Sequence, residues 1–203
     1  MINRRQLLIS GAASMAVAPA LAQPAVVTGE GALLPRDASG RPRIVIAGGG
    51  WGGLSAARHL REQVPNAEVI VLERNPVFWS CPISNKWLID VVNTDYLLHD
   101  MTQPARRYGY QLVQTEVMAI ERDKKQVRTA HGRIDYDYLI LAGGIRNAYG
   151  AWFGNDAKAI SHTRKSFPSA YIPNGEHVAL KKKIHAFKGG TMVMTLPPPP
   201  HRC

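Results

Sequence analysis

A glycine-rich turn between a short apolar run and an amphipathic stretch most restricts the fold of this 203-residue chain. Residues 48–53 are Gly-Gly-Gly-Trp-Gly-Gly, which satisfies the spacing G-x-G-x-x-G. The β-branched run 43–47 before the turn is typical of a buried strand, and residues 52–63 after it have helical spacing. A second apolar run, 68–72, completes a strand, turn, helix and strand. The pattern predicts a βαβ unit of an α/β, Rossmann-like fold.

Each key glycine has its own role if the turn binds a dinucleotide. Gly48 permits the tight turn, Gly50 lets a pyrophosphate approach the backbone, and Gly53 lets the helix pack close to the strand. The free N–H groups at the start of the helix attract phosphate. Glu73 ends the second strand about 20 residues later, where a carboxylate accepts a hydrogen bond from a ribose. The alternative is a purely structural glycine turn.

FAD and NAD share this fingerprint, and two features favour FAD. The βαβ unit lies near the start of the mature chain, once the N-terminal export signal is removed. An exported protein also meets little free NAD. Residues 136–144, a strand ending in Ala142-Gly143-Gly144, resemble the second flavin-contacting stretch of flavoproteins with two dinucleotide-binding domains. By that pattern Val117 contacts the adenine through its backbone; the alternative is that Val117 is a core residue.

The N-terminus has the three parts of an export signal. Arg4 and Arg5 precede a weakly apolar run, 7–22, which ends in the small-x-small site Ala-Leu-Ala. The arginine pair resembles a twin-arginine signal, and the short run argues against a stable membrane span. We expect a signal peptide at 1–22, a linker at 23–41 and a periplasmic location. An ordinary Sec signal or a membrane anchor is the alternative.

The basic charge is scattered and does not form one block. The formal net charge is +10, from 25 Lys and Arg against 15 Asp and Glu. Small groups of basic residues of this kind are typical of a solvated surface, and no nucleic-acid-binding motif accompanies them. An acidic partner or an anionic ligand is the alternative. The groups are Arg41–Arg43, Arg106–Arg107, Lys124–Lys125 and Lys181–Lys183.

The rest of the chain predicts a less regular structure. We expect an FAD-binding domain at 42–150, followed at 151–203 by the start of a second dinucleotide-type domain. Because the chain stops just after an apolar run and four prolines, we expect an N-terminal fragment that is incomplete at its C-terminus. The expected elements are loops and short helices at 75–110, a meander of strands at 112–120, 126–129 and 132–136, a strand at 138–142, a loop-rich connection at 145–175, a basic helix at 177–187 with Val178 and Lys181–Lys182 on different faces, and a strand at 191–196.

Two cysteines, Cys81 and Cys203, exclude a disulfide-stapled scaffold and the usual paired zinc-ligand spacings. Cys81 follows the ribose-binding acid in a loop that leaves the carboxyl edge of a strand, where ligands bind in doubly wound folds. The alternative is an inert, buried loop cysteine.

From residue 43 to the end, the chain resembles the flavin-binding subunits of the flavocytochrome c sulfide dehydrogenase family. The two cysteine contexts are the most specific parts of the resemblance. The matching residues are the 48–53 turn, Glu73-Arg74-Asn75-Pro76, Cys81-Pro82-Ile83-Ser84-Asn85, residues 136–144, and Gly189-Gly190-Thr191 leading through Pro197–Pro200 to His201-Arg202-Cys203.

The resemblance implies that Cys81 forms a thioether to the flavin ring, and it places Arg74 and Asn85 among the FAD-binding residues. It implies that Cys203 is the catalytic half of a redox disulfide that sulfide or a related sulfur compound attacks. Electrons then pass through the flavin to a c-type cytochrome subunit. Two departures stand out: Trp87-Leu88-Ile89-Asp90 replaces the glycines usual after Ser-Asn, and the chain holds no second disulfide cysteine besides Cys81.

Two other functions fit the residues. One is a quinone- or NADH-linked flavoprotein with non-covalent FAD. The other is a non-catalytic, truncated export product. As a sulfide dehydrogenase, the 203 residues are not expected to be competent alone.

Overall fold

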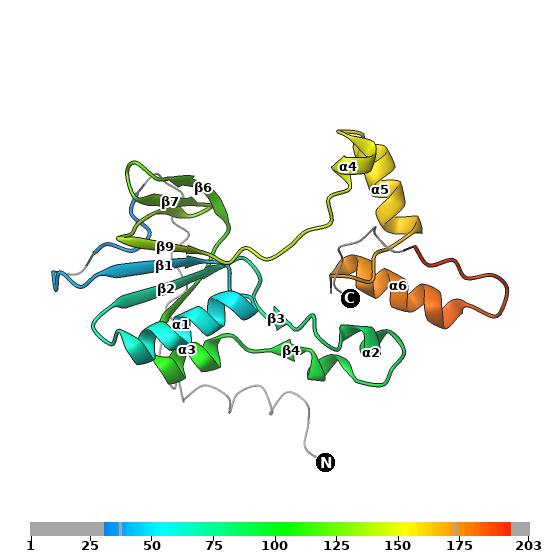
Figure 1. Cartoon of the computed structure of the whole chain (residues 1–203), viewed down its shortest axis with the longest axis horizontal. Helices are drawn as coiled ribbons and strands as arrows, with labels where there is room; N and C mark the ends of the chain where they lie inside the picture. Colours follow the sequence, from blue (N-terminus) through cyan, green and yellow to red (C-terminus); the bar gives the residue numbers. More distant parts are fainter. Residues whose placement is uncertain (1–30, 37, 173, 196–203) are drawn as a thin grey trace, which may run out of the picture.

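A four-stranded parallel sheet is the centre of the structure, a computed structural model that describes residues 31–36, 38–172 and 174–195. The order is β5-β2-β1-β9, and all three pairs are parallel (Figure 1). Every residue of β1 is buried, as an apolar run in a parallel sheet requires. The predicted α/β class is therefore confirmed. The strands are β1 (Arg43–Ala47), β2 (Glu68–Glu73), β5 (Gln111–Gln114) and β9 (Tyr138–Leu141).

Different layers cover the two faces of this sheet. Helices α1 (Trp51–Gln63) and α3 (Thr102–Tyr108) cover one face, where Ile44 and Ile46 pack. Val45 points the other way, because side chains alternate along a strand. It packs against an antiparallel meander that holds the buried Val127 and Ile134. The meander strands are β6 (Val117–Glu121), β7 (Gln126–Thr129) and β8 (Gly132–Asp135).

The expectation of a single meander strand over Leu112–Ile120 is wrong. Residues 111–114 form β5, which pairs in parallel with the edge of β2. The Thr115 N–H then donates to the Glu73 carbonyl at 2.9 Å, and β6 begins at Val117 in the other sheet. The apolar run was correctly identified as strand, but alternation along a sequence does not say which neighbouring strand it pairs with.

Short elements fill 75–110, as expected. The two-residue strands β3 (Phe78–Trp79) and β4 (Leu98–His99) pair antiparallel. Between them lie α2 (Ser84–Leu88) and a 3-10 turn, η1 (Thr94–Tyr96).

The connection 145–175 is more ordered than its sequence suggests, since it contains α4 (Gly150–Phe153) and α5 (Ala157–Ser166). Glu176, which is buried, joins this region to the next helix. Its carboxylate accepts the Tyr149 hydroxyl at 2.5 Å and pairs with Arg164 at 3.1 Å. Burial, with the bond to Glu176, raises the pKa of Tyr149 to about 12.

The predicted basic helix is present as α6 (Gly175–Ala186), which packs against α2 (Figure 1). Its faces differ from the expectation, because Val178, Lys181 and Lys182 line the same surface. The predicted strand at 191–196 is wrong over the described residues 191–195. Met192, Val193 and Met194 are exposed there, and an apolar run with no neighbouring strand to pair with does not form one.

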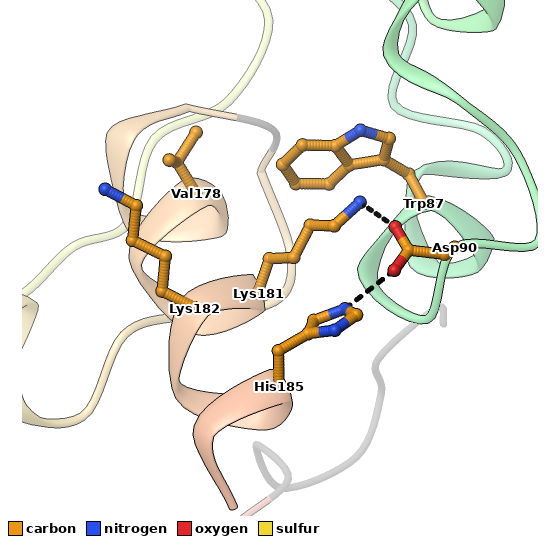
Figure 2. A pocket seen from close by; sticks show the side chains of 6 residues that line it. All are labelled: Trp87, Asp90, Val178, Lys181, Lys182 and His185. Carbon is orange, nitrogen blue, oxygen red and sulfur yellow. Dashed lines mark ion pairs between the residues drawn. The ribbon is translucent and has the colours of Figure 1, made fainter.

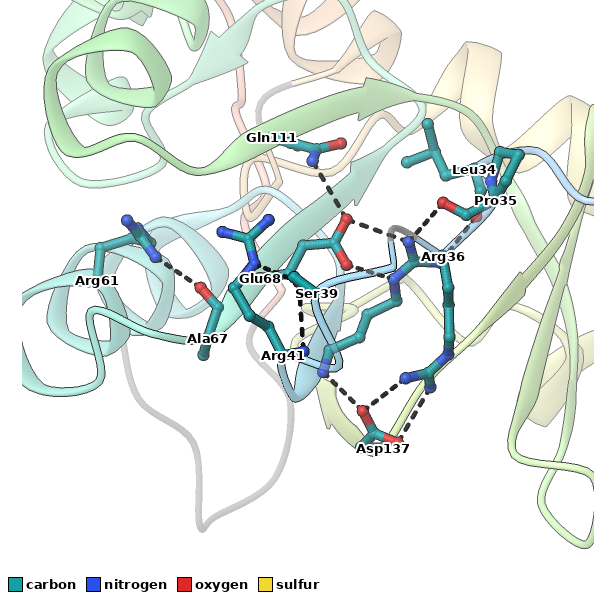
Figure 3. A network of polar contacts seen from close by, with 11 residues as sticks. Leu34, Pro35, Arg36, Ser39, Arg41, Arg61, Ala67, Glu68, Gln111 and Asp137 are labelled. Atoms are coloured by element: carbon teal, nitrogen blue, oxygen red, sulfur yellow. Dashed lines mark hydrogen bonds and ion pairs between the residues drawn. The ribbon is translucent and has the colours of Figure 1, made fainter.

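A polar network that includes Glu68 and Asp137 ties the segment before β1 to the sheet (Figure 3), and a buried arginine lies at its centre. The Arg43 side chain is 1% exposed and pairs with Glu68 at 2.6 Å. Its guanidinium also donates to the carbonyls of Leu34 (2.7 Å) and Pro35 (2.9 Å). Asp137 accepts the Arg43 backbone N–H at 2.7 Å. Leu34 and Pro35 of the expected linker thus attach to the sheet.

We expect Glu68→Ala to lower the free energy of unfolding by about 3–5 kcal/mol, because it leaves the buried Arg43 charge without its carboxylate. Urea denaturation of the purified chain measures this loss. Glu62→Ala is the matched control. It removes the exposed Arg58–Glu62 pair on α1 and should cost less than about 1 kcal/mol. Equal losses in the two variants would contradict a structural role for the buried pair.

A second prediction concerns acid stability. Hydrogen bonds from the Arg36 side chain, then from the Arg43 N–H, lower the pKa of Asp137 to about 2. A lowered carboxyl pKa contributes stability above the unfolded pKa of about 3.9, and that contribution is lost as the pH falls towards 2. Asp137→Asn should therefore flatten the fall in melting temperature between about pH 4 and pH 2. An unchanged slope would show that other carboxyls cause the fall.

Candidate functional site

The glycine turn connects β1 to α1 at the carboxyl edge of the sheet. Gly48 has φ +114°, and a Cβ there would lie 2.2 Å from the Ala142 carbonyl oxygen. A Cβ on Gly53 would lie 1.8 Å from the Gly48 carbonyl oxygen. A Cβ on Gly50 would meet nothing within 4 Å. Packing within the chain therefore requires the first and third glycines, whereas Gly50 borders open space that a ligand can enter.

Glu73 lies against this turn at the end of β2. One carboxylate oxygen accepts the Gly49 N–H at 2.7 Å, and the other accepts the backbone and side-chain N–H groups of Asn75 at 2.8 and 2.7 Å. Each carboxylate oxygen has two acceptor positions, so capacity for a ribose hydroxyl remains. The next residue, Arg74, is exposed and pairs loosely with Glu116 at 3.4 Å.

The end of β9 completes the edge. The Ala142 N–H donates to the Ala47 carbonyl at 2.8 Å, which places Ala142 beside the glycine turn. Gly143 and Gly144 follow it and are exposed. Val117 is partly buried and packs against the cluster under the meander, as its core interpretation requires. Its contact with adenine stays a prediction.

Cys81 lies on a tight turn after β3. Cys81 is exposed, which excludes the buried interpretation, and its thiol donates to the Tyr171 carbonyl at 3.3 Å. The Ser84 N–H closes the turn on the Cys81 carbonyl at 3.0 Å. Asn85 is exposed and its side-chain oxygen accepts the Lys86 N–H. Cys203 lies outside the described residues.

An aromatic contact that the sequence reasoning missed joins these two parts of the edge. Trp51, the first residue of α1, meets Phe78 edge to face, with ring centroids 5.2 Å apart. Phe78 begins β3, the strand that leads to the Cys81 turn. The only sign of this contact in the local sequence is the presence of a tryptophan, Trp51, inside the glycine motif.

A shallow, largely apolar pocket of about 280 Å³ lies between α2 and α6 (Figure 2). The Lys181 ammonium lies 4.2 Å from the centroid of the Trp87 ring and pairs with Asp90, which also contacts His185 at 3.1 Å. The hydrogen bond from Lys181 lowers the pKa of Asp90. Trp87 and Asp90, which follow the Ser84-Asn85 pair, thus contact α6. The lining residues are Trp87, Asp90, Val178, Lys181, Lys182 and His185.

Over residues 31–36, 38–172 and 174–195, no group of His, Cys, Asp or Glu could hold a metal ion. No helix within those same ranges is long and apolar enough to cross a membrane.

Alanine substitutions should separate the structural glycine from the ligand-facing one. Gly53→Ala should destabilise the ligand-free chain by about 3 kcal/mol or more, because its Cβ overlaps backbone. Gly50→Ala should cost less than about 1 kcal/mol. Gly50→Ala should nevertheless weaken FAD binding, measured by flavin fluorescence titration. Full FAD affinity in Gly50→Ala would argue against pyrophosphate at this turn.

Comparison with known proteins assigns the family. Residues 42–179 match the profile of pyridine nucleotide-disulphide oxidoreductases. The type II NADH:quinone oxidoreductases of Staphylococcus aureus (strain NCTC 8325 / PS 47) and Staphylococcus haemolyticus are 26% and 23% identical over 110 and 112 residues, which is 53% and 54% of this chain. The matches cover 27% and 28% of those proteins, so the chain spans about a quarter of their length.

A solved structure has the same fold. The sulfide:quinone oxidoreductase of Aquifex aeolicus superposes with a TM-score of 0.60 at 20% identity, over 71% of this chain and 32% of that one. Given the profile match over more than half of its residues, the chain belongs to the FAD-binding pyridine nucleotide-disulphide oxidoreductase family.

Proposed function

We propose that this protein is the flavin subunit of an exported oxidoreductase that oxidises sulfide, or a related sulfur compound, and passes electrons to a c-type cytochrome. The observation that carries the proposal is the exposed thiol of Cys81, held on a proline-containing turn. Trp51 and Phe78 connect that turn to the glycine turn. The proposed thioether to the flavin needs such an accessible thiol.

The residues at the carboxyl edge fit FAD. The open space at Gly50 and the start of α1 would take the pyrophosphate, while Gly48 and Gly53 keep the turn compact. Glu73 would hold the ribose, and we place Arg74, Asn85, Val117 and the Ala142–Gly144 stretch among the cofactor-binding residues. Bound there, FAD supplies two-electron oxidation of the substrate and one-electron delivery to the acceptor.

We assign the sulfur chemistry to Cys203, on the resemblance to the flavin subunits of flavocytochrome c sulfide dehydrogenases. In that role Cys203 forms a disulfide whose sulfur accepts attack by sulfide, and the partner thiolate leaves. Cys81 is reserved for the flavin, so the partner cysteine must come from outside these 203 residues. Residues 42–150 would form the FAD-binding domain, and residue 151 would begin the second dinucleotide-type domain.

Export to the periplasm is proposed from the arginine pair and the Ala-Leu-Ala site at 20–22. A c-type cytochrome in the same compartment is a one-electron acceptor that suits a flavin donor. A small sulfur substrate and this cytochrome are therefore the proposed partners.

A second candidate is a quinone- or NADH-linked flavoprotein with non-covalent FAD. It is favoured by the relatives named type II NADH:quinone oxidoreductase, one of them 26% identical over about half of the chain. Sulfide-dependent reduction of cytochrome c supports the first candidate, and NADH-dependent reduction of a quinone supports the second. A protease-sensitive chain that takes up no FAD would instead be the non-catalytic product.

The covalent bond is directly testable on the full chain. After loading with FAD and precipitation in acid, the protein pellet should stay yellow, and the peptide containing Cys81 should carry the flavin mass. Cys81→Ser should release the flavin completely into the supernatant. Cys203→Ser, the matched control, should keep the pellet yellow. Flavin released by acid from the unmodified chain would exclude the thioether and favour the second candidate.

A further inference from the structure

His177, the third residue of α6, is fully buried beneath the Cys81 turn. Its Nε2 lies 3.1 Å from the Ser84 carbonyl oxygen, and its ring stacks on Trp87 with centroids 5.8 Å apart. A carbonyl only accepts, so Nε2 carries the hydrogen and donates it. Nδ1 of the neutral ring is then a bare acceptor, and within the described part of the chain this buried atom has no hydrogen-bond partner.

An unpaired buried nitrogen is unfavourable, so apolar filling alone does not explain a histidine here. Phenylalanine would stack on Trp87 without that cost. What the imidazole adds is one donated hydrogen bond, to Ser84. Burial lowers the pKa of His177, which keeps the ring neutral and so preserves this arrangement.

The turn that receives this bond needs support. Pro82 restricts the backbone of Cys81 before it, and Ile83, a β-branched residue, has φ +71°. A conformation of this kind persists only where the surrounding structure enforces it. Ser84 follows Ile83 directly, and its N–H and carbonyl bond to the Cys81 carbonyl and to His177.

A second contact comes from the same part of the chain. The Tyr171 carbonyl accepts the Cys81 thiol at 3.3 Å, six positions before His177. Tyr171 therefore holds the thiol, and His177 holds the far end of its turn. Within the described residues, His177 is the histidine that bonds to the Cys81 turn. His185, on the same helix, bonds instead to the Leu88 carbonyl at the end of α2.

We propose that His177 is a positioning residue, which holds the Cys81 turn in the geometry from which the thiol attaches the flavin. The inference rests on the proposed function for its flavin part, but the restraint on the turn exists without flavin. His177 takes no part in bond making. It acts through the Ser84 carbonyl.

Three variants of the full chain test this role. His177→Phe keeps an aromatic ring against Trp87 and removes the donor. His177→Gln replaces the ring by an amide N–H that reaches the same carbonyl. His185→Phe is the matched control, because it removes a histidine bond between α6 and α2 away from the Cys81 turn. After loading with FAD, acid-resistant flavin should fall in His177→Phe and be retained in His177→Gln and His185→Phe.

A second measurement separates failure of this inference from failure of the proposed function. In the FAD-free chain, the rate of Cys81 alkylation by iodoacetamide is followed by peptide mass analysis, with Cys203 as the internal reference for reagent. Loss of one hydrogen bond should raise the Cys81 rate about two- to tenfold in His177→Phe and leave it unchanged in the other two variants. Melting curves confirm that each variant is folded.

The outcomes are distinct. If the unmodified chain binds no flavin covalently but the alkylation rates follow the expected order, the proposed thioether is wrong and the positioning role stands. If His177→Phe and His177→Gln behave alike, or if His185→Phe changes the Cys81 rate as much as His177→Phe does, His177 only packs α6 against α2 and the inference is overturned.

Discussion

Backbone contact between the glycine turn and the end of β9 is the constraint on which the site depends. Gly48 and Ala142 approach so closely that no Cβ fits between them, and Gly53 lies equally close to the Gly48 carbonyl. These contacts set where α1 starts relative to the carboxyl ends of β1 and β9. A Cβ at Gly50 would, by contrast, meet nothing within 4 Å. The structure thus separates the glycines that shape the site from the glycine that a ligand would approach.

The acid at the end of β2 belongs to this same unit. Glu73 holds the Gly49 N–H, while the Gly48 N–H donates to the Leu72 carbonyl at 2.9 Å. The turn is therefore fixed from β2 on one side and from β9 on the other. A ribose that bonds to Glu73 would share a carboxylate that already shapes the turn, so ligand binding and turn geometry depend on one group.

Helices and strands with a clear local sequence pattern could be predicted. Those whose structure depends on pairing with distant residues could not. The run 43–47, the helix after the glycine turn and the run 68–72 carry their own signals, namely β-branched burial, helical spacing and a glycine motif. Residues 111–114 and 191–195 show the limit. Both have apolar residues at their centre, yet only the first pairs with a neighbouring strand, β2.

The candidate site divides in the same way. The spacing of the glycine motif alone predicts Gly48, Gly50 and Gly53, and the acid about 20 residues later predicts Glu73. His177 bonds to Ser84 across 93 positions, and Tyr171 bonds to Cys81 across 90, so no local pattern indicates either contact. The one sequence clue was Trp87-Leu88-Ile89-Asp90, where the expectation from resemblance was glycine. In the structure Trp87 stacks on His177, and Asp90 pairs with Lys181 and His185. Side-chain contacts with α6 thus hold the segment 87–90.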